Sequence, residues 1–267
     1  MSAIEEKRMY GDHREETVAY LATGQGVATV RISGDQVGRF GLEHRCRARD
    51  VATTDGAVVV ATDGDVLVGP GPFESLDFGP AVAVSASDDG PTFAADETGT
   101  VSRYDDGDWT AVGSVGEVRA LSDEFVAAAD GVFRVDGNDL TAVGLDAARD
   151  VTAGDGTPLA ATDDGLYRLG NGWLREREGS FAAVAAGQGQ AHAATADALY
   201  AREDEWTGVD LPVAEPVVDV DYGECVYAAT EPGTVLVEAD PDRTADGAGG
   251  WRSRSIGLPD VSALAVA

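Results

Sequence analysis

The chain has 267 residues, of which 48 are acidic and 19 basic, and its formal net charge is −29. Such self-repulsion destabilises a compact state at low ionic strength, whereas about 1 M salt shortens the Debye length to roughly 3 Å and screens most of it. We therefore expect a protein of a salt-rich cytoplasm, and the same charge argues against nucleic acid and anionic membranes as partners.

No apolar run in residues 1–17 has the length of a signal peptide, and no stretch of about 18 apolar residues occurs anywhere. We therefore expect a soluble, cytoplasmic protein. Two cysteines, Cys46 and Cys225, are too few for a disulfide framework or a thiolate metal site. The 34 glycines and 7% aromatic residues indicate many short strands joined by tight turns, as in an all-β protein.

Residues 1–16 precede the first repeat and form an expected N-terminal extension. From residue 17 onward, seven short segments align with one alanine in common, at intervals between 33 and 39 residues. The alanines are Ala22, Ala61, Ala95, Ala128, Ala161, Ala194 and Ala229. Two residues earlier stands a large, mostly apolar column: Tyr20, Val59, Phe93, Val126, Leu159, His192 and Tyr227. A spacing of two residues marks one buried face of a strand.

A turn rich in Asp and Gly follows each segment, and a second short strand completes a β-hairpin, as at 165–168. A further apolar column stands at the start of an expected third strand and contains all four tryptophans. Its members are Val37, Phe73, Trp109, Leu140, Trp173, Trp206 and Trp251. We expect these side chains to pack between neighbouring sheets.

A segment of small residues precedes each hairpin and suits the crowded strand nearest a central axis. The first repeat lacks this segment, but an unused copy stands at 261–267. The sequence therefore predicts an all-β fold, a seven-bladed β-propeller closed by pairing of the C-terminal strand with the N-terminal blade. An open β-solenoid would not explain the terminal half-repeat.

The expected organisation is a single propeller over 17–267. Its blades are expected at approximately 260–267 with 17–45, then 46–80, 81–116, 117–147, 148–179, 180–214 and 215–259. The sequence of residues 238–250, inside the last blade, predicts a disordered surface loop.

The hairpin motif of Ala161-Thr-Asp-Asp-Gly-Leu-Tyr-Arg, followed by Trp173, resembles degenerate propeller repeats, and 104–110 resembles a worn Asp-box of sialidase-like propellers. Over its whole length, including 4–8 and 44–51, the chain resembles a haloarchaeal family of β-propeller proteins. The resemblance implies the fold and the habitat. It implies no activity and carries over no catalytic residue.

The candidate ligand-binding residues are arginines and aspartates at the starts of expected inner strands. Arg49-Asp50 and Arg149-Asp150 occupy equivalent places in blades 2 and 5, and Arg119 a comparable place in blade 4. They would line the mouth of the central channel and bind a small anion. In the alternative interpretation, which the sequence favours, the Arg–Asp pairs tie adjacent blades together.

Other charged clusters have similarly open interpretations. Arg45, Arg47 and Arg49 could grip an anionic partner or protect an outer strand from edge-to-edge pairing. Asp-rich turns such as 63–65, 105–108 and 163–164 lack the spacing of a calcium loop and indicate a solvated acidic surface. His192 would be hydrogen-bonded in the core.

No set of nucleophile, base and oxyanion donors can be assembled, so we expect no catalytic residues, no metal and no cofactor. The hypothesis is a monomeric, non-enzymatic interaction module with a protein partner. The alternative is an enzyme or a small-anion-binding protein whose site lies at the channel mouth. The sequence leaves the identity of either partner open.

Overall fold

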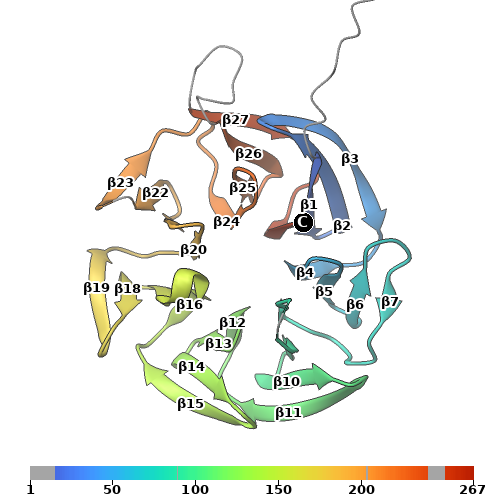
Figure 1. The fold of residues 1–267 in the computed structure, drawn as a ribbon, viewed down its shortest axis with the longest axis vertical. Coiled ribbons are helices and arrows are strands. Elements are labelled where there is room, and N and C mark those ends of the chain that lie inside the picture. The colour runs from blue at the N-terminus through green and yellow to red at the C-terminus, as the bar shows by residue number, and fades with distance from the viewer. Residues whose placement is uncertain (1–15, 89, 203, 240–249) are drawn as a thin grey trace, which may run out of the picture.

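The protein is described by a computed structural model that covers residues 16–88, 90–202, 204–239 and 250–267. Residues 1–15 of the expected extension and 240–249 of the expected surface loop lie outside the described residues. Among the described residues, seven four-stranded antiparallel sheets stand round a central axis like the blades of a propeller (Figure 1). In this part of the chain, no helix has the length and apolar character needed to cross a membrane.

Each sheet runs from an innermost strand to an outermost strand in chain order, except that the last strand of the chain is the innermost of blade 1. Blade 1 contains β28 (Val261–Val266), β1 (Glu16–Thr23), β2 (Gly26–Ser33) and β3 (Gln36–His44). Blade 2 contains β4 (Ala48–Thr53), β5 (Val58–Thr62), β6 (Val66–Gly69) and β7 (Glu74–Ser75). Blade 3 contains β8 (Ala83–Ser85), β9 (Thr92–Ala95), β10 (Thr100–Asp105) and β11 (Asp108–Ser114).

The remaining four blades follow the same order. Blade 4 contains β12 (Val118–Ser122), β13 (Phe125–Ala128), β14 (Gly131–Asp136) and β15 (Asp139–Gly144). Blade 5 contains β16 (Ala148–Thr152), the 3-10 turn η1 (Gly154–Gly156), β17 (Leu159–Thr162), β18 (Gly165–Leu169) and β19 (Trp173–Glu178). Blade 6 contains β20 (Ala183–Gly187), β21 (Gln190–Ala194), β22 (Leu199–Arg202) and β23 (Trp206–Val209). Blade 7 contains β24 (Val217–Tyr222), β25 (Val226–Thr230), β26 (Thr234–Ala239) and β27 (Gly250–Ser255).

The threonine that follows the repeated alanine builds the central hairpin turn in several blades. In blade 2, Thr62 Oγ1 donates a hydrogen bond to the carbonyl of Asp65 and accepts one from its amide, at 2.7 and 2.9 Å. Thr162 makes the same pair of bonds with Gly165 in blade 5. A side chain that satisfies both backbone groups of a tight turn holds the hairpin closed.

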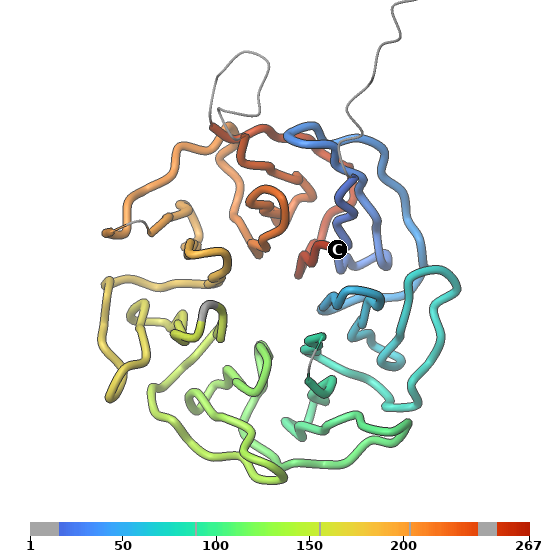
Figure 2. Tube along the Cα trace, in the orientation of Figure 1, coloured from blue at the N-terminus to red at the C-terminus, as the bar shows by residue number. Residues whose placement is uncertain are grey.

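The ring closes as the sequence predicts, because β28 pairs with β1. Leu264 lies opposite Leu21 and Val266 opposite Ala19 in an antiparallel register. The trace runs once round the axis from blue to red, so that the C-terminal strand lies beside the N-terminal blade (Figure 2). This pairing completes blade 1 and leaves it no unpaired inner edge on β1.

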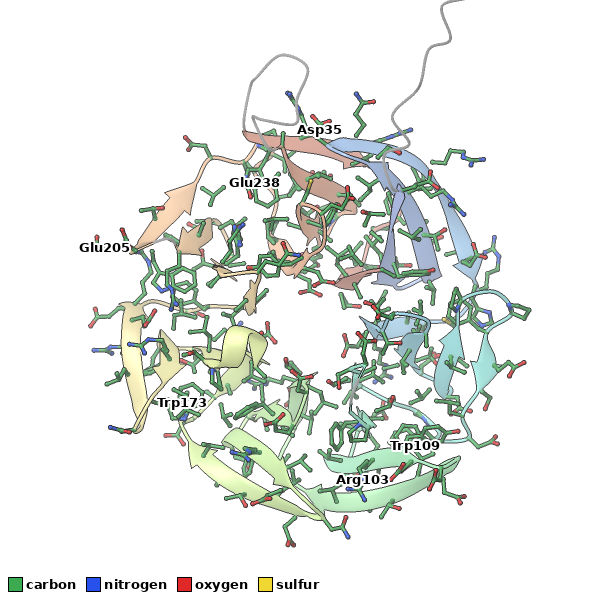
Figure 3. The ribbon with its side chains drawn as sticks, viewed as in Figure 1. Asp35, Arg103, Trp109, Trp173, Glu205 and Glu238 are labelled. Carbon is green, nitrogen blue, oxygen red and sulfur yellow. The ribbon has the colours of Figure 1, made fainter. Side chains whose placement is uncertain are left out.

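Seven apolar clusters fill the spaces between successive blades, and the predicted outer column contributes one residue to each. Trp173, for example, packs against the core between blades 4 and 5, and its indole N–H donates to the carbonyl of Val143 at 3.1 Å. Trp109 makes the equivalent bond to Leu76 at 2.8 Å (Figure 3). All seven residues of the column are half-buried, so the third-strand register is correct.

In blade 4 the predicted alanine column is wrong by one residue. Ala127, rather than Ala128, lies opposite the first apolar residue of the next strand, and Phe125 takes the place expected for Val126. Phe125 and Ala127 face blade 5 and pack in the cluster between these two blades. The alternation could not reveal this because Val126 and Ala128 are equally buried, on the opposite face.

Candidate functional site

A cavity of about 380 Å³ occupies the centre of the ring. It is lined by residues of all seven inner strands, from β4 through β24 to the closing strand β28. The predicted site residues Arg49, Asp50, Arg119, Arg149 and Asp150 all line this one cavity. The fold therefore brings together residues that are far apart in the sequence, such as Arg49 and Asp150.

The three arginines share one local structure, which places them at the same opening. In blades 2, 4 and 5, the ladder between the innermost strand and its neighbour is interrupted by a register shift after the first pair. Arg49, Arg119 and Arg149 are the extra residues at these shifts. Because every inner strand begins at the same end of the ring, these β-bulges aim the guanidinium groups at the same mouth of the cavity.

Each guanidinium group also has an acidic neighbour. Arg49 contacts Glu97 of blade 3 at 2.6 Å, and Arg149 contacts Asp163 of its own blade. Arg119 lies 3.4 Å from Glu117 and donates to the carbonyl of Ala148 in blade 5 at 3.3 Å.

All three arginine pairs are partly exposed to solvent. Such pairs contribute at most about 1 kcal/mol to stability.

The aspartates do not pair with the neighbouring arginines, which corrects the interpretation that Arg–Asp pairs tie the blades. Asp50 instead accepts two backbone hydrogen bonds of 2.8 Å, from Val51 in its own strand and from Val84 in blade 3. The inner strand has unpaired amides on its channel side, and one carboxylate satisfies two of them. The aspartate therefore ties the blades, through the backbone of its neighbour.

The same bridge, which we call the aspartate clasp, occurs in two further blades. Asp150 accepts from Val151 and from Val184 of blade 6, and Asp219 accepts from Val220 and from Leu264 of blade 1. Each bond is 2.8 Å long. Three clasps thus hold the seams between blades 2 and 3, 5 and 6, and 7 and 1.

The seam that closes the ring has an additional clasp. Asp221, two residues beyond Asp219 on β24, accepts from Tyr222 of its own strand and from Val266 of the closing strand, both at 2.8 Å. Blade 4 has alanine, Ala120, at the clasp position. The four clasps span three seams and involve six blades, and blade 4 takes part in none of them.

The surroundings of these aspartates raise their pKa values. Burial raises the pKa of Asp50 to about 7, against the effect of its amide donors and with a contribution from the charge of Asp150. Burial likewise raises the pKa of Asp150 to about 6. Asp219 has a pKa well above the ordinary value, chiefly because of burial and in part because of the charges of Asp150, Asp221 and Asp50. The carboxylates therefore repel one another across the cavity.

The opposite end of the channel contains a structural pair. The ring of His192 is buried in blade 6, and its Nδ1 lies 2.9 Å from the hydroxyl of Tyr222 in blade 7. That hydroxyl donates to the carbonyl of Ala185 at 3.2 Å, so it accepts from His192. Burial lowers the pKa of His192 to about 4, which keeps the ring neutral. As expected, this core histidine is hydrogen-bonded.

The chemistry available at the cavity is binding by guanidinium groups and acceptance of protons by carboxylates. Among its described lining residues there is no histidine, cysteine or lysine, so the serines of the lining have no such base beside them. Within the described ranges, no group of three or more His, Cys, Asp or Glu side chains could hold a metal ion.

Sequence reasoning missed Asp219 and Asp221, because the alternating segment 217–222 was assigned only as a small-residue inner strand. The recurrence of Asp at the third place of the inner strand in blades 2, 5 and 7 was the available signal.

This ring of seven four-stranded sheets round a lined channel defines a β-propeller. The family model described as Beta-prop_HVO_0234:-like, beta propeller, matches residues 3–267, and the chain belongs to that family. No curated protein matches the chain in sequence.

Solved propellers share the fold at low sequence identity. The WD40 propeller domain of Doa1 is 13% identical, with a TM-score of 0.63 over 91% of this chain and 90% of that chain. The computationally designed Ika8 protein is 17% identical, with a TM-score of 0.63 over 92% of this chain and 86% of that chain. YCF48 from Cyanidioschyzon merolae is 14% identical, with a TM-score of 0.59 over 80% of this chain and 86% of that chain. At these identities the likeness concerns the fold alone.

Proposed function

We propose that the protein is a non-enzymatic scaffold that binds a protein partner in a salt-rich cytoplasm and acts as a monomeric disc. The observation that carries this proposal is the use of the channel carboxylates. Asp50, Asp150 and Asp219 each accept two amides from two blades, so these aspartates serve the ring itself. An acid or base engaged in this way is poorly placed for proton transfer to a substrate.

The clasped ring is suited to presenting a surface without changing shape. Every seam between blades has an apolar cluster, and three seams have aspartate clasps as well. A rigid surface loses little conformational entropy on association, which favours binding. The acidic surface keeps such a disc soluble at high salt.

Affinity purification of the tagged protein above about 1 M KCl tests the scaffold proposal, since screening there suppresses non-specific charge attraction. A partner found in this way is then purified and mixed with the protein, and light scattering measures the mass of the complex. A complex of fixed stoichiometry supports the scaffold. Retention of a small anion, with no protein, contradicts it.

The second candidate function is binding of a small anion at the cavity mouth. It is supported by the three guanidinium groups, from blades 2, 4 and 5, at one opening. Guanidinium groups bind carboxylate and phosphate with paired hydrogen bonds. The repelling carboxylates deeper in the cavity would confine such an anion to the mouth.

Calorimetric titration with citrate and with inorganic phosphate tests the anion site. Arg119→Gln should abolish the binding heat, and Arg134→Gln, an exposed change on the outer part of blade 4, should leave it unchanged. Absence of binding heat with both anions, or equal loss in both variants, refutes this candidate.

A further inference from the structure

The outer edge of blade 1 differs from the other outer edges in length. β3 extends over nine residues, whereas the other outermost strands have between two and seven. Among the strands of the described ranges, it pairs with β2 alone, on one side. Near its start, Arg254 of β27 donates to the carbonyls of Val37 and Gly38, each at 2.7 Å, so the two strands lie together at the seam (Figure 1). The open edge is therefore the part of β3 from Arg39 onward.

This part of β3 and the residues just after it contain three exposed arginines whose guanidinium groups have no partner among the described residues. Arg39 on β3, and Arg45 and Arg47 just after it, are exposed, and their guanidinium groups make no ion pair, aromatic contact or hydrogen bond with the part of the chain that the structure describes. Every other arginine that the structure describes contacts a carboxylate, a backbone carbonyl or an aromatic ring. In a chain with 48 acidic residues, three free guanidinium groups within nine positions form a distinct basic surface.

An exposed aromatic side chain lies within this surface. Phe40 has 40% of its area exposed, and the guanidinium group of Arg254 lies 5.2 Å from its ring centre. The cation covers one face of the ring, and part of the ring remains in solvent. We call residues 39–47 the blade 1 rim: an open strand edge, three free guanidinium groups and one exposed phenyl ring.

We propose that the blade 1 rim binds an extended acidic segment of a partner protein, which adds a strand to β3. The inference rests on the proposed scaffold function and names its surface and the chemistry of its partner. Main-chain hydrogen bonds to the open edge would provide affinity, and carboxylates paired with the arginines would provide specificity. Because the Debye length is only roughly 3 Å at about 1 M salt, direct contacts of this kind persist where long-range attraction is lost.

Charge complementarity favours this occupant over a second copy of the chain or a nucleic acid. The rim contains one acidic residue, Glu43, against its three arginines. A two-fold pairing of rims would place arginine against arginine. A nucleic acid could contact the guanidinium groups but has no peptide backbone to pair with the strand edge, and its binding weakens steeply with salt.

The test uses the whole protein and a labelled synthetic peptide of about ten residues in which Asp and Val alternate, matching the two faces of a strand. Fluorescence anisotropy in about 1 M KCl measures binding. The double variant Arg45→Glu/Arg47→Glu should bind at least about tenfold more weakly, which corresponds to about 1.4 kcal/mol. Arg134→Glu, a change at an arginine of blade 4 that is also exposed, should bind like the wild type. Thermal unfolding confirms that both variants fold.

Hydrogen exchange locates the peptide. Added peptide should slow exchange in residues 36–44 and leave the outer strand β15 unchanged. Lack of wild-type binding, protection elsewhere, or equal binding of a peptide with Lys in place of Asp overturns the assignment. Dimerisation that the double variant abolishes would assign the rim to a second copy, and tighter binding of duplex DNA would assign it to nucleic acid; either result also overturns it.

Further outcomes distinguish a failure of the rim assignment from a failure of the scaffold proposal. Self-association of Arg39→Ser/Arg45→Ser/Arg47→Ser without peptide binding by the wild type would show that the arginines only guard the edge. If the partner found by affinity purification binds the charge-reversed double variant as tightly as the wild type, the scaffold stands and the rim assignment is wrong. If that partner forms a complex neither with the wild type nor with the double variant, the proposed function itself fails.

Discussion

Protonation of the aspartate clasps should make the protein more stable at pH 5 than at pH 8. The folded state raises the pKa of Asp50 from 3.8 to about 7 and that of Asp150 to about 6. Between these pH values the folded protein binds protons that the unfolded chain has released, so unfolding releases protons and stability falls as pH rises. The stabilisation is fully present only at low pH and is lost as pH rises through the folded pKa.

The linkage relation gives the size of this effect. For Asp50, integration from pH 8 to pH 5 yields about 2.6 kcal/mol of additional stability, and for Asp150 about 1.4 kcal/mol. These are upper values because both carboxyl groups face a channel that admits water and influence each other's titration. His192 opposes them: burial lowers its pKa from 6.5 to about 4, so at pH 5 the unfolded chain binds a proton that the folded ring does not, and the net gain is smaller. Urea unfolding followed by tryptophan fluorescence, at a fixed KCl concentration of about 3 M, measures the change with surface repulsion screened.

A matched pair of variants isolates the clasp from the general titration of the surface. Asp50→Asn retains the shape and one acceptor but cannot titrate, so its stability should depend less on pH than that of the wild type. Asp139→Asn, an exposed change on β15, should retain the wild-type dependence. Stability that rises from pH 5 to pH 8, or parallel curves for Asp50→Asn and the wild type, would refute the reasoning.

Three other perturbations have defined outcomes. The midpoint of thermal unfolding should rise markedly from about 0.1 M to above about 1 M KCl, because screening relieves the −29 charge; a salt-independent midpoint contradicts this. Deletion of 260–267 removes β28 and should abolish the cooperative melt followed by circular dichroism, and unchanged stability would mean that the closure is dispensable. Trp173→Ala should lower urea stability by about 3 kcal/mol because it empties an inter-blade space, whereas the neighbouring Leu174→Ala, 54% exposed, should change it little; equal effects would disprove the packing role.

The repeat made most of the fold predictable from the sequence. The seven hairpins, the outer column and the unused inner strand each repeat a pattern whose meaning is local: alternation, turn chemistry and a large ring at a strand start. Blade 4 shows where this reasoning failed. In the run Phe125 to Ala128, both faces of the strand are buried, so the alternation that fixes a half-exposed strand carries no information about register.

The sequence could predict where the candidate site residues lie, but it could not predict which groups they bind. Equivalent places in the repeat put Arg49 and Arg149 at the same mouth, which follows from symmetry alone. What Asp50 binds depends on the amide of Val84 in the next blade, thirty-four residues away, and no local pattern shows it. The free arginines of the rim could likewise be recognised only after the ion pairs of the other arginines were known.

The closing strand also bears on the speed of folding. Ser262 of β28 meets Ala22 of β1 across 240 positions of sequence, whereas the other blades pair strands that are adjacent in the chain. Such a large sequence separation raises the contact order and slows the step that must bring the strands together. During synthesis β28 is also the last of these strands to emerge. The inner edge of β1 therefore stays unpaired until the other blades have been synthesised. A circular permutant that begins at residue 260 and joins the old ends would make every blade local, and would reach the closed ring sooner without any change in its final contacts.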